Sequence, residues 1–136
     1  MKILFVCTGN TCRSPMAKAI FDQMTNNAYK TESAGLSAIE QSPASENAVL
    51  AMQKMGVDLS GHKAKKITEE MLAEVDIVVP MTKTHAYIIM QYGVQSDKIV
   101  LIGKGEGIDD PYGGSVEDYM RCAQELKEGV RCLLVN

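Results

Sequence analysis

A short apolar run, residues 3–6, leads directly into the polar segment Cys7-Thr8-Gly9-Asn10-Thr11-Cys12-Arg13-Ser14, and a helical pattern begins at its end. A strand that passes through a loop of small residues into a helix aims several backbone N–H groups at one point, an arrangement that binds phosphate. Arg13 adds a planar cation that can bond two phosphate oxygens at once. We therefore expect a phosphate site at the end of the first strand, with the Cys7 thiol as its nucleophile.

The rest of the chain repeats the alternation of strand and helix. Strand-like apolar runs are expected at residues 3–6, 31–33, 76–81 and 98–102, and helices at residues 15–24, 43–55 and 82–92. A capping pattern, Ser115-x-x-Asp118, predicts the start of a final helix. Parallel strands joined by helical crossovers predict an α/β fold. We expect a single domain over residues 1–136, a four-stranded parallel sheet with helices on both faces, and a ligand site at the carboxyl ends of the strands.

Composition excludes several classes of partner. The formal net charge is -3 and the pI about 5.4, so no global basic field attracts nucleic acid or anionic lipid. The apolar runs are far shorter than the ~20 residues that cross a bilayer. Cysteines occur in the loop and in a late helical pattern, at Cys122 and Cys132, unlike a secreted disulfide scaffold. We expect a cytoplasmic protein that binds neither nucleic acid nor membrane.

A pair of carboxylates, Asp109 and Asp110, follows the glycine-rich stretch at residues 103–107, which is not a nucleotide-binding fingerprint because no helix starts after it. A leaving group on phosphorus needs a proton, and two adjacent carboxylates resist simultaneous ionisation, so one of them can act as the acid. Pro111 biases Asp110 towards an extended backbone, which makes Asp110 the preferred acid. This chemistry requires no metal or other cofactor.

The loop itself is expected to supply most of the rate. A helix N-terminus and Arg13 favour the thiolate form of Cys7, but full ionisation of a thiol gains only about thirtyfold. Enzymes accelerate phosphate ester hydrolysis by up to ~10²¹. The larger contribution must come from N–H groups and Arg13, which bind the equatorial oxygens more tightly in the transition state.

The sequence resembles the low-molecular-weight protein tyrosine phosphatases, whose signature is an N-terminal strand ending in Cys-x5-Arg-Ser and a distant Asp-Pro. Here these are residues 7–14 and Asp110-Pro111. The resemblance implies that Cys7 is the nucleophile, Arg13 the phosphate clamp and Asp110 the general acid. It further implies that Asn10 and Ser14 hold the loop and thiolate, and that Cys12 is a reversible disulfide partner of Cys7. The implied substrate-binding residues are Thr8, Gly9, Asn10, Thr11, Cys12, Ser14 and Tyr112, the last as a pocket wall.

Thr11 departs from the tyrosine-specific pattern, which usually has a larger branched aliphatic residue at this position. The loop therefore resembles that of the bacterial protein arginine phosphatases. A small hydroxyl side chain leaves room for a guanidinium, which it can hydrogen-bond. The resemblance implies hydrolysis of phosphotyrosine, phosphoarginine or both in proteins, through a phosphocysteine intermediate that releases inorganic phosphate.

Other interpretations are open at this stage. An arsenate reductase can share this fold, but it needs further cysteines, and none occurs between Cys12 and Cys122. A non-catalytic phosphoprotein-binding module is expected to lack one of Cys7, Arg13 and Asp110, all of which are present. A zinc site at Cys7 and Cys12 is disfavoured because a closed site needs four ligands.

The two histidines have no motif of their own. By spacing alone His62 is expected at the surface, whereas the resemblance implies that it supports the loop. His85 is expected on the surface of its helix.

Overall fold

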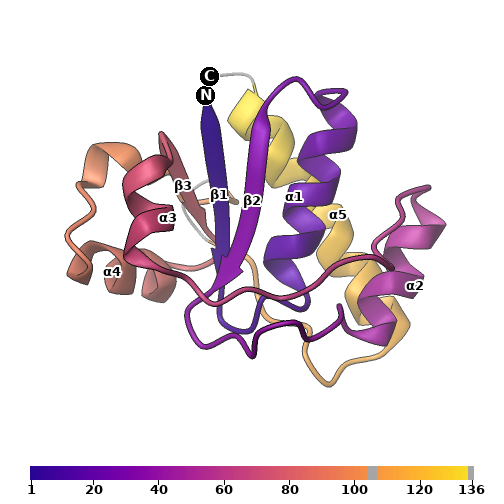
Figure 1. Ribbon diagram of the computed structural model, residues 1–136. Helices are drawn as coiled ribbons and strands as arrows, with labels where there is room; N and C mark the ends of the chain where they lie inside the picture. The colour runs from indigo at the N-terminus through magenta and orange to yellow at the C-terminus, as the bar shows by residue number, and fades with distance from the viewer. Residues whose placement is uncertain (104–106, 135–136) are drawn as a thin grey trace.

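Three parallel strands form the sheet within the part of the chain that the structure describes. This structure is a computed structural model and describes residues 1–103 and 107–134. The central strand β1 (Lys2–Cys7) lies between β2 (Lys30–Gly35) and β3 (Ile77–Pro80), and both neighbours run parallel to it (Figure 1). The carboxyl ends of all three strands therefore meet at one edge.

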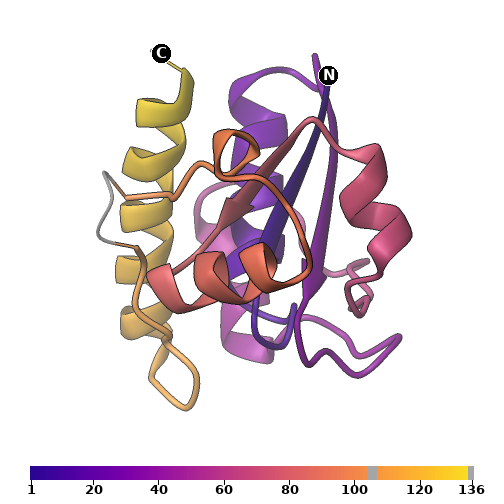
Figure 2. The same cartoon turned by 90° about the vertical axis from the view of Figure 1, so that its left-hand side faces the viewer.

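Helices cover both faces of this sheet, as predicted. On one face lie α1 (Arg13–Met24), α2 (Glu46–Lys54) and α5 (Val116–Leu134); on the other lie α3 (Glu69–Glu74) and α4 (Lys83–Gln91) (Figures 1 and 2). Alternate residues of β1 enter two separate cores: Phe5 packs with α1, α2 and α5, whereas Leu4 and Val6 pack with α3 and α4. Burial on both faces explains why β1 is an unbroken apolar run.

The prediction of a fourth strand at residues 98–102 is wrong. Its beginning lies in the short 3₁₀ turn η1 (Ser96–Lys98), and Ile99 makes one isolated parallel bridge with Val78. The segment still donates hydrogen bonds to β3, from Val100 N to the Val78 carbonyl (2.9 Å) and from Ile102 N to the Pro80 carbonyl (3.4 Å). In a parallel ladder the N–H of Pro80 would have to donate in return, but proline has none.

Capping side chains explain where the helices begin. Ser115 and Asp118 cap α5 reciprocally, through Ser115 N to Asp118 Oδ2 (2.9 Å) and Asp118 N to Ser115 Oγ (3.2 Å), as the sequence predicts. Ser45 caps α2, so this helix starts later than expected. The short helix α3 was not expected; Thr68 caps it.

Most of the glycine-rich stretch, residues 104–106, lies outside the described residues. Among those described, no helix combines the length and the apolar character needed to span a membrane.

His85 is buried, which corrects the expectation of a surface position. The side chain lies in the first turn of α4, where its backbone N–H donates to the capping Thr82 Oγ1 (3.1 Å), and the residue is only 4% exposed. Because α4 follows the carboxyl end of β3, its first turn lies at the edge of the sheet where the Cys7 loop also lies. Burial lowers the pKa of His85 from its ordinary value of 6.5 to about 4; Arg13 adds to this effect and Asp110 opposes it.

This neutral histidine predicts acid sensitivity of the fold. Between its unfolded pKa near 6.5 and its folded pKa near 4, the unfolded chain binds a proton that the folded chain does not, so stability falls as the pH drops through this window. From about pH 7 to about pH 5, we expect His85 to contribute about 1–2 kcal/mol of lost stability. His85→Gln, which does not titrate, should show a correspondingly flatter profile in urea unfolding; identical profiles would contradict this assignment.

Gly35, at the end of β2, permits the Cys7 loop to pass against the strand. A Cβ atom there would lie 2.6 Å from the Thr8 carbonyl oxygen and 2.9 Å from Asn10 N, both of them backbone atoms. We expect Gly35→Ala to lower the free energy of unfolding by about 1–3 kcal/mol and to weaken phosphate binding. Gly61→Ala is the matched control, because a Cβ atom at Gly61 meets nothing within 4 Å. Equal behaviour of the two variants in urea unfolding and phosphate titration would refute this role.

Candidate active site

The loop after β1 is anchored on its outer side by the chain that follows β2. The carbonyl of Cys7 accepts from Leu36 N (3.0 Å), and that of Thr8 accepts from Ser37 N (2.9 Å). The described chain has no cis peptide bond, and the C=O and N–H of a trans peptide group point in opposite directions. The N–H groups that follow these two carbonyls, those of Thr8 and Gly9, therefore point away from residues 36–37.

Asn10 holds the turn of the loop. Its φ of 57° lies in the left-handed region, and its N–H donates to the sulfur of Cys7 (3.3 Å). The side chain is fully buried, with Nδ2 donating to Ser14 Oγ (2.8 Å) and Ser33 Oγ (2.9 Å) and Oδ1 accepting from Lys65 N (2.9 Å). These bonds offset the cost of the left-handed backbone.

His62 supports the same residue from behind. Its Nε2 lies 2.6 Å from the carbonyl oxygen of Asn10, and since a carbonyl can only accept, this nitrogen carries the hydrogen. Burial lowers the pKa of His62, although the bond to Asn10 opposes this shift. His62 is only partly buried, so it keeps some of the surface exposure expected from spacing, and the contact with the loop implied by the family resemblance is also present.

The sulfur of Cys7 is buried and lies 2.9 Å from Ser14 Oγ. The Ser14 hydroxyl already accepts a hydrogen bond from Asn10 Nδ2. Its own hydrogen is therefore available to the sulfur, and a hydroxyl that donates to a thiolate forms a charge-assisted bond. Together with Asn10 N, two donors are directed at this atom.

Arg13 begins α1, and its guanidinium joins the loop to a distant segment. The residue is only 5% exposed; Nη1 donates to the Ile108 carbonyl (2.9 Å), and Nη2 lies 3.5 Å from Asp110 Oδ2. The N-cap residue of α1, Cys12, makes no side-chain capping bond, so the positive end of this helix is open towards the loop.

A pocket of about 260 Å³ gathers most of the residues expected at the site. Its walls are Cys7, Thr8, Gly9, Thr11, Cys12, Arg13, Asp110 and Tyr112. Asn10 and Ser14 lie behind this wall and contact the sulfur. Asp109 is not among the lining residues. Asp110 is about half exposed, and its Oδ1 accepts from Tyr112 N (3.0 Å), which fixes the carboxylate in a local turn.

Cys12 lies in a polar surrounding contributed by α2 and α5. Its sulfur is 3.5 Å from the Tyr119 hydroxyl and 3.8 Å from Ser45 Oγ. Burial raises the pKa of Tyr119 to about 12, so this phenol keeps its proton at neutral pH. Cys7 and Cys12 are both free thiols in this structure.

Three contacts at the site have no counterpart in the sequence motifs. They are the hydrogen bond between His85 Nε2 and Thr8 Oγ1 (2.8 Å), the Ile108 carbonyl on Arg13, and Ser33 on Asn10. A backbone acceptor leaves no signal in side-chain identity. Only His85 had a detectable signal, because it opens the helix that follows a strand ending at this edge.

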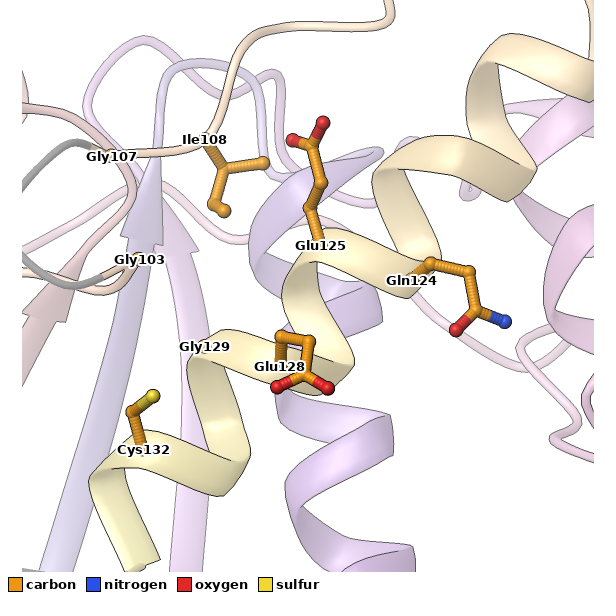
Figure 3. Close-up of a pocket in the computed structure, with 8 residues that line it drawn as sticks. All are labelled: Gly103, Gly107, Ile108, Gln124, Glu125, Glu128, Gly129 and Cys132. Carbon is orange, nitrogen blue, oxygen red and sulfur yellow. The ribbon is translucent and has the colours of Figure 1, made fainter.

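A second hollow, of about 380 Å³, lies between α5 and the segment that carries Ile108 (Figure 3). Glu125 and Glu128 project from α5 at its side, and the side chain of Ile108 forms part of its wall (Figure 3). The carbonyl of Ile108 accepts from Arg13, so this residue contributes to both sites. Among the described residues, no three of the His, Cys, Asp and Glu side chains form a group able to hold a metal ion.

Comparison with known proteins places this geometry in a family. The family described as low molecular weight phosphotyrosine protein phosphatase matches the chain over residues 2–136. A protein-arginine-phosphatase of Bacillus subtilis (strain 168) is 37% identical, over 98% of this chain and 94% of the relative. The low molecular weight protein-tyrosine-phosphatase Ptp of Acinetobacter johnsonii is 39% identical, over 81% of this chain and 79% of the relative.

Solved structures agree with these relatives. The YwlE arginine phosphatase, in a mutant with a phosphorylated active-site serine, superimposes with a TM-score of 0.91 at 37% identity, over 98% of this chain and 93% of that chain. A low molecular weight protein tyrosine phosphatase from T. tengcongensis superimposes with a TM-score of 0.90 at 40% identity, over 99% and 98%. The chain therefore belongs to the low molecular weight phosphotyrosine protein phosphatase family.

Proposed function

We propose that this chain hydrolyses phosphorylated side chains of proteins through a phosphocysteine at Cys7. The observation that carries the proposal is the meeting of the Cys7 sulfur, the Arg13 guanidinium and the Asp110 carboxylate around one pocket, although they come from opposite ends of the sequence. The family match over residues 2–136 supports one phosphatase domain over residues 1–136. The pattern of cysteines supports a cytoplasmic location.

The reaction takes two displacements at phosphorus. In the first, the Cys7 thiolate forms the S–P bond while the bond from phosphorus to the substrate nitrogen or oxygen breaks, and protonated Asp110 gives its proton to that leaving atom. In the second, water attacks phosphorus, Asp110 takes a proton from the water, and the P–S bond breaks. Inorganic phosphate leaves and the thiolate is restored.

Charge stabilisation in the loop supplies the larger part of the rate. The inward-directed N–H groups of the loop and the buried Arg13 bind the phosphoryl oxygens, and each fixed donor of this kind is worth about 3 kcal/mol in comparable sites. Ser14 and Asn10 N stabilise the departing thiolate in the second step, when the P–S bond breaks.

The function is tested directly by assaying phosphotyrosine and phosphoarginine peptides in the presence of a chelator. Release of inorganic phosphate without added metal is expected. Phosphate binding without turnover would instead favour the binding module. An arsenate reductase would instead reduce arsenate with a thiol donor. We do not expect this reaction, because Asp110 lines the pocket, where it can act as an acid. In addition, burial raises the pKa of the Cys122 thiol to about 12, which leaves it unsuited to thiol exchange.

Asp110 is the proposed acid, because it lines the pocket and Asp109 does not. We expect Asp110→Asn to lower kcat by about 10² to 10⁴ on a substrate with a poor leaving group, and by less on an activated aryl phosphate. Asp109→Asn is the matched control in the same steady-state assay and should retain most of the activity. A larger loss in the Asp109 variant would invert the assignment.

Phosphoarginine is the proposed preferred substrate. Thr11 lines the pocket, and its carbonyl accepts from Ser45 N (2.9 Å), which ties the backbone at this position to the start of α2. A threonine at this position leaves room for a guanidinium and offers it a hydroxyl for hydrogen bonding. Relatives with the name protein-arginine-phosphatase, from B. subtilis and Geobacillus stearothermophilus, support the same preference.

Replacing Thr11 tests this preference. We expect Thr11→Ile to shift the ratio of kcat/KM for phosphoarginine over phosphotyrosine by tenfold or more towards tyrosine, equivalent to ~1.4 kcal/mol, because an aliphatic side chain removes a hydrogen-bonding group and favours a ring. Both constants are measured on peptides that differ only in the phosphorylated residue. An unchanged ratio would show that Thr11 does not set specificity.

A further inference from the structure

The bond between His85 and Thr8 joins the first turn of α4 to the first residue of the loop after the nucleophile. His85 Nε2 lies 2.8 Å from Thr8 Oγ1. His85 is buried, whereas Thr8 is exposed and lines the phosphate pocket. The histidine itself does not line this pocket, so it reaches the site only through Thr8.

The other ring nitrogen identifies the tautomer. Nδ1 of His85 is buried and has no hydrogen-bond partner in the described part of the chain. A hydrogen on Nδ1 would be a buried donor without an acceptor, close to the positive N-terminal end of α4. A bare lone pair at that position is the better arrangement. Nε2 therefore carries the hydrogen and donates it to Thr8 Oγ1.

The hydroxyl of Thr8 can then donate its own hydrogen to another group. Its Oγ1 accepts the hydrogen of His85 Nε2 through one lone pair, so the hydroxyl hydrogen must point to an acceptor other than His85. The Thr8 backbone is held too, since its carbonyl accepts from Ser37 N. With the backbone and Oγ1 both held, the hydroxyl hydrogen is left for a group inside the pocket that Thr8 lines.

We propose that His85 is a positioning residue that makes the Thr8 hydroxyl a side-chain hydrogen-bond donor to an oxygen of the phosphoryl group bound at Cys7. This inference rests on the proposed function for the identity of the anion. It adds one neutral donor to the main-chain N–H groups and Arg13. The ring acts as a neutral group throughout, because burial and Arg13 disfavour its protonation.

Binding of inorganic phosphate, measured by calorimetry near neutral pH, tests this arrangement. Thr8→Val keeps the shape of the side chain and removes the hydroxyl, and we expect it to weaken binding about tenfold. His85→Leu should weaken binding similarly. The double variant should be no weaker than either single one, because both remove the same donor. Thr8→Ser and His85→Gln, which keep the hydroxyl and the N–H donor, should restore most of the affinity.

Two results of the binding experiment would overturn the proposal. One is a phosphate affinity of Thr8→Val within about twofold of the unmodified protein. The other is additive losses in the double variant. If His85→Leu fails to fold, nitrogen NMR of the histidine rings in the unmodified protein decides, with hydrogen on Nε2 and a bare Nδ1 expected at His85 and the reverse pattern contradicting it. Neither readout needs turnover, so a protein that binds phosphate in this way but hydrolyses no substrate would disprove only the proposed function.

Discussion

The outward anchoring of the loop carbonyls is the constraint on which the rest of this site depends. The N–H groups of residues 36 and 37 donate to the carbonyls of Cys7 and Thr8, and the N–H groups that follow these carbonyls therefore point to the opposite side. The left-handed Asn10 then brings its own N–H to the Cys7 sulfur. A cluster of parallel dipoles would be unfavourable in an unsupported loop; here the chain after β2 and the bonds to Asn10 hold it before any anion arrives. Such preorganisation is what makes donors effective in a transition state.

The second half of the site comes from the other end of the sequence. Arg13 is nearly inaccessible to solvent, yet its guanidinium bonds the Ile108 carbonyl and approaches Asp110. One buried cation therefore joins the Cys7 loop to the segment that carries Asp110, the proposed acid. Because a guanidinium presents several donors in a fixed plane, it can hold residues 108–110 with one edge and leave other N–H groups for the phosphoryl oxygens of the proposed reaction.

Much of this arrangement could be predicted from the sequence, because its determinants are local. The run from strand to small-residue loop to helix predicts where the N–H groups gather, and the pair of Ser115 and Asp118 predicts the start of α5. The missing fourth strand could have been anticipated from Pro80, whose absent N–H leaves the neighbouring segment without a return hydrogen bond. The sequence indicates that His85 lies in the first turn after β3, but neither its burial nor the bond from Arg13 to Ile108 could be predicted in this way. Both depend on how β3, α4 and residues 107–110 pack together, and a backbone carbonyl as acceptor has no side-chain signature.

The central claim is that the sulfur of Cys7 is the atom that attacks phosphorus. Rapid acid quenching of the unmodified protein during turnover of a phosphorylated peptide, followed by mass spectrometry of its fragments, tests this most directly. The account predicts one phosphate on the fragment that contains Cys7, formed before inorganic phosphate appears and lost as the substrate is consumed. Turnover with no phosphate on that fragment, or with phosphate on another residue, would contradict it.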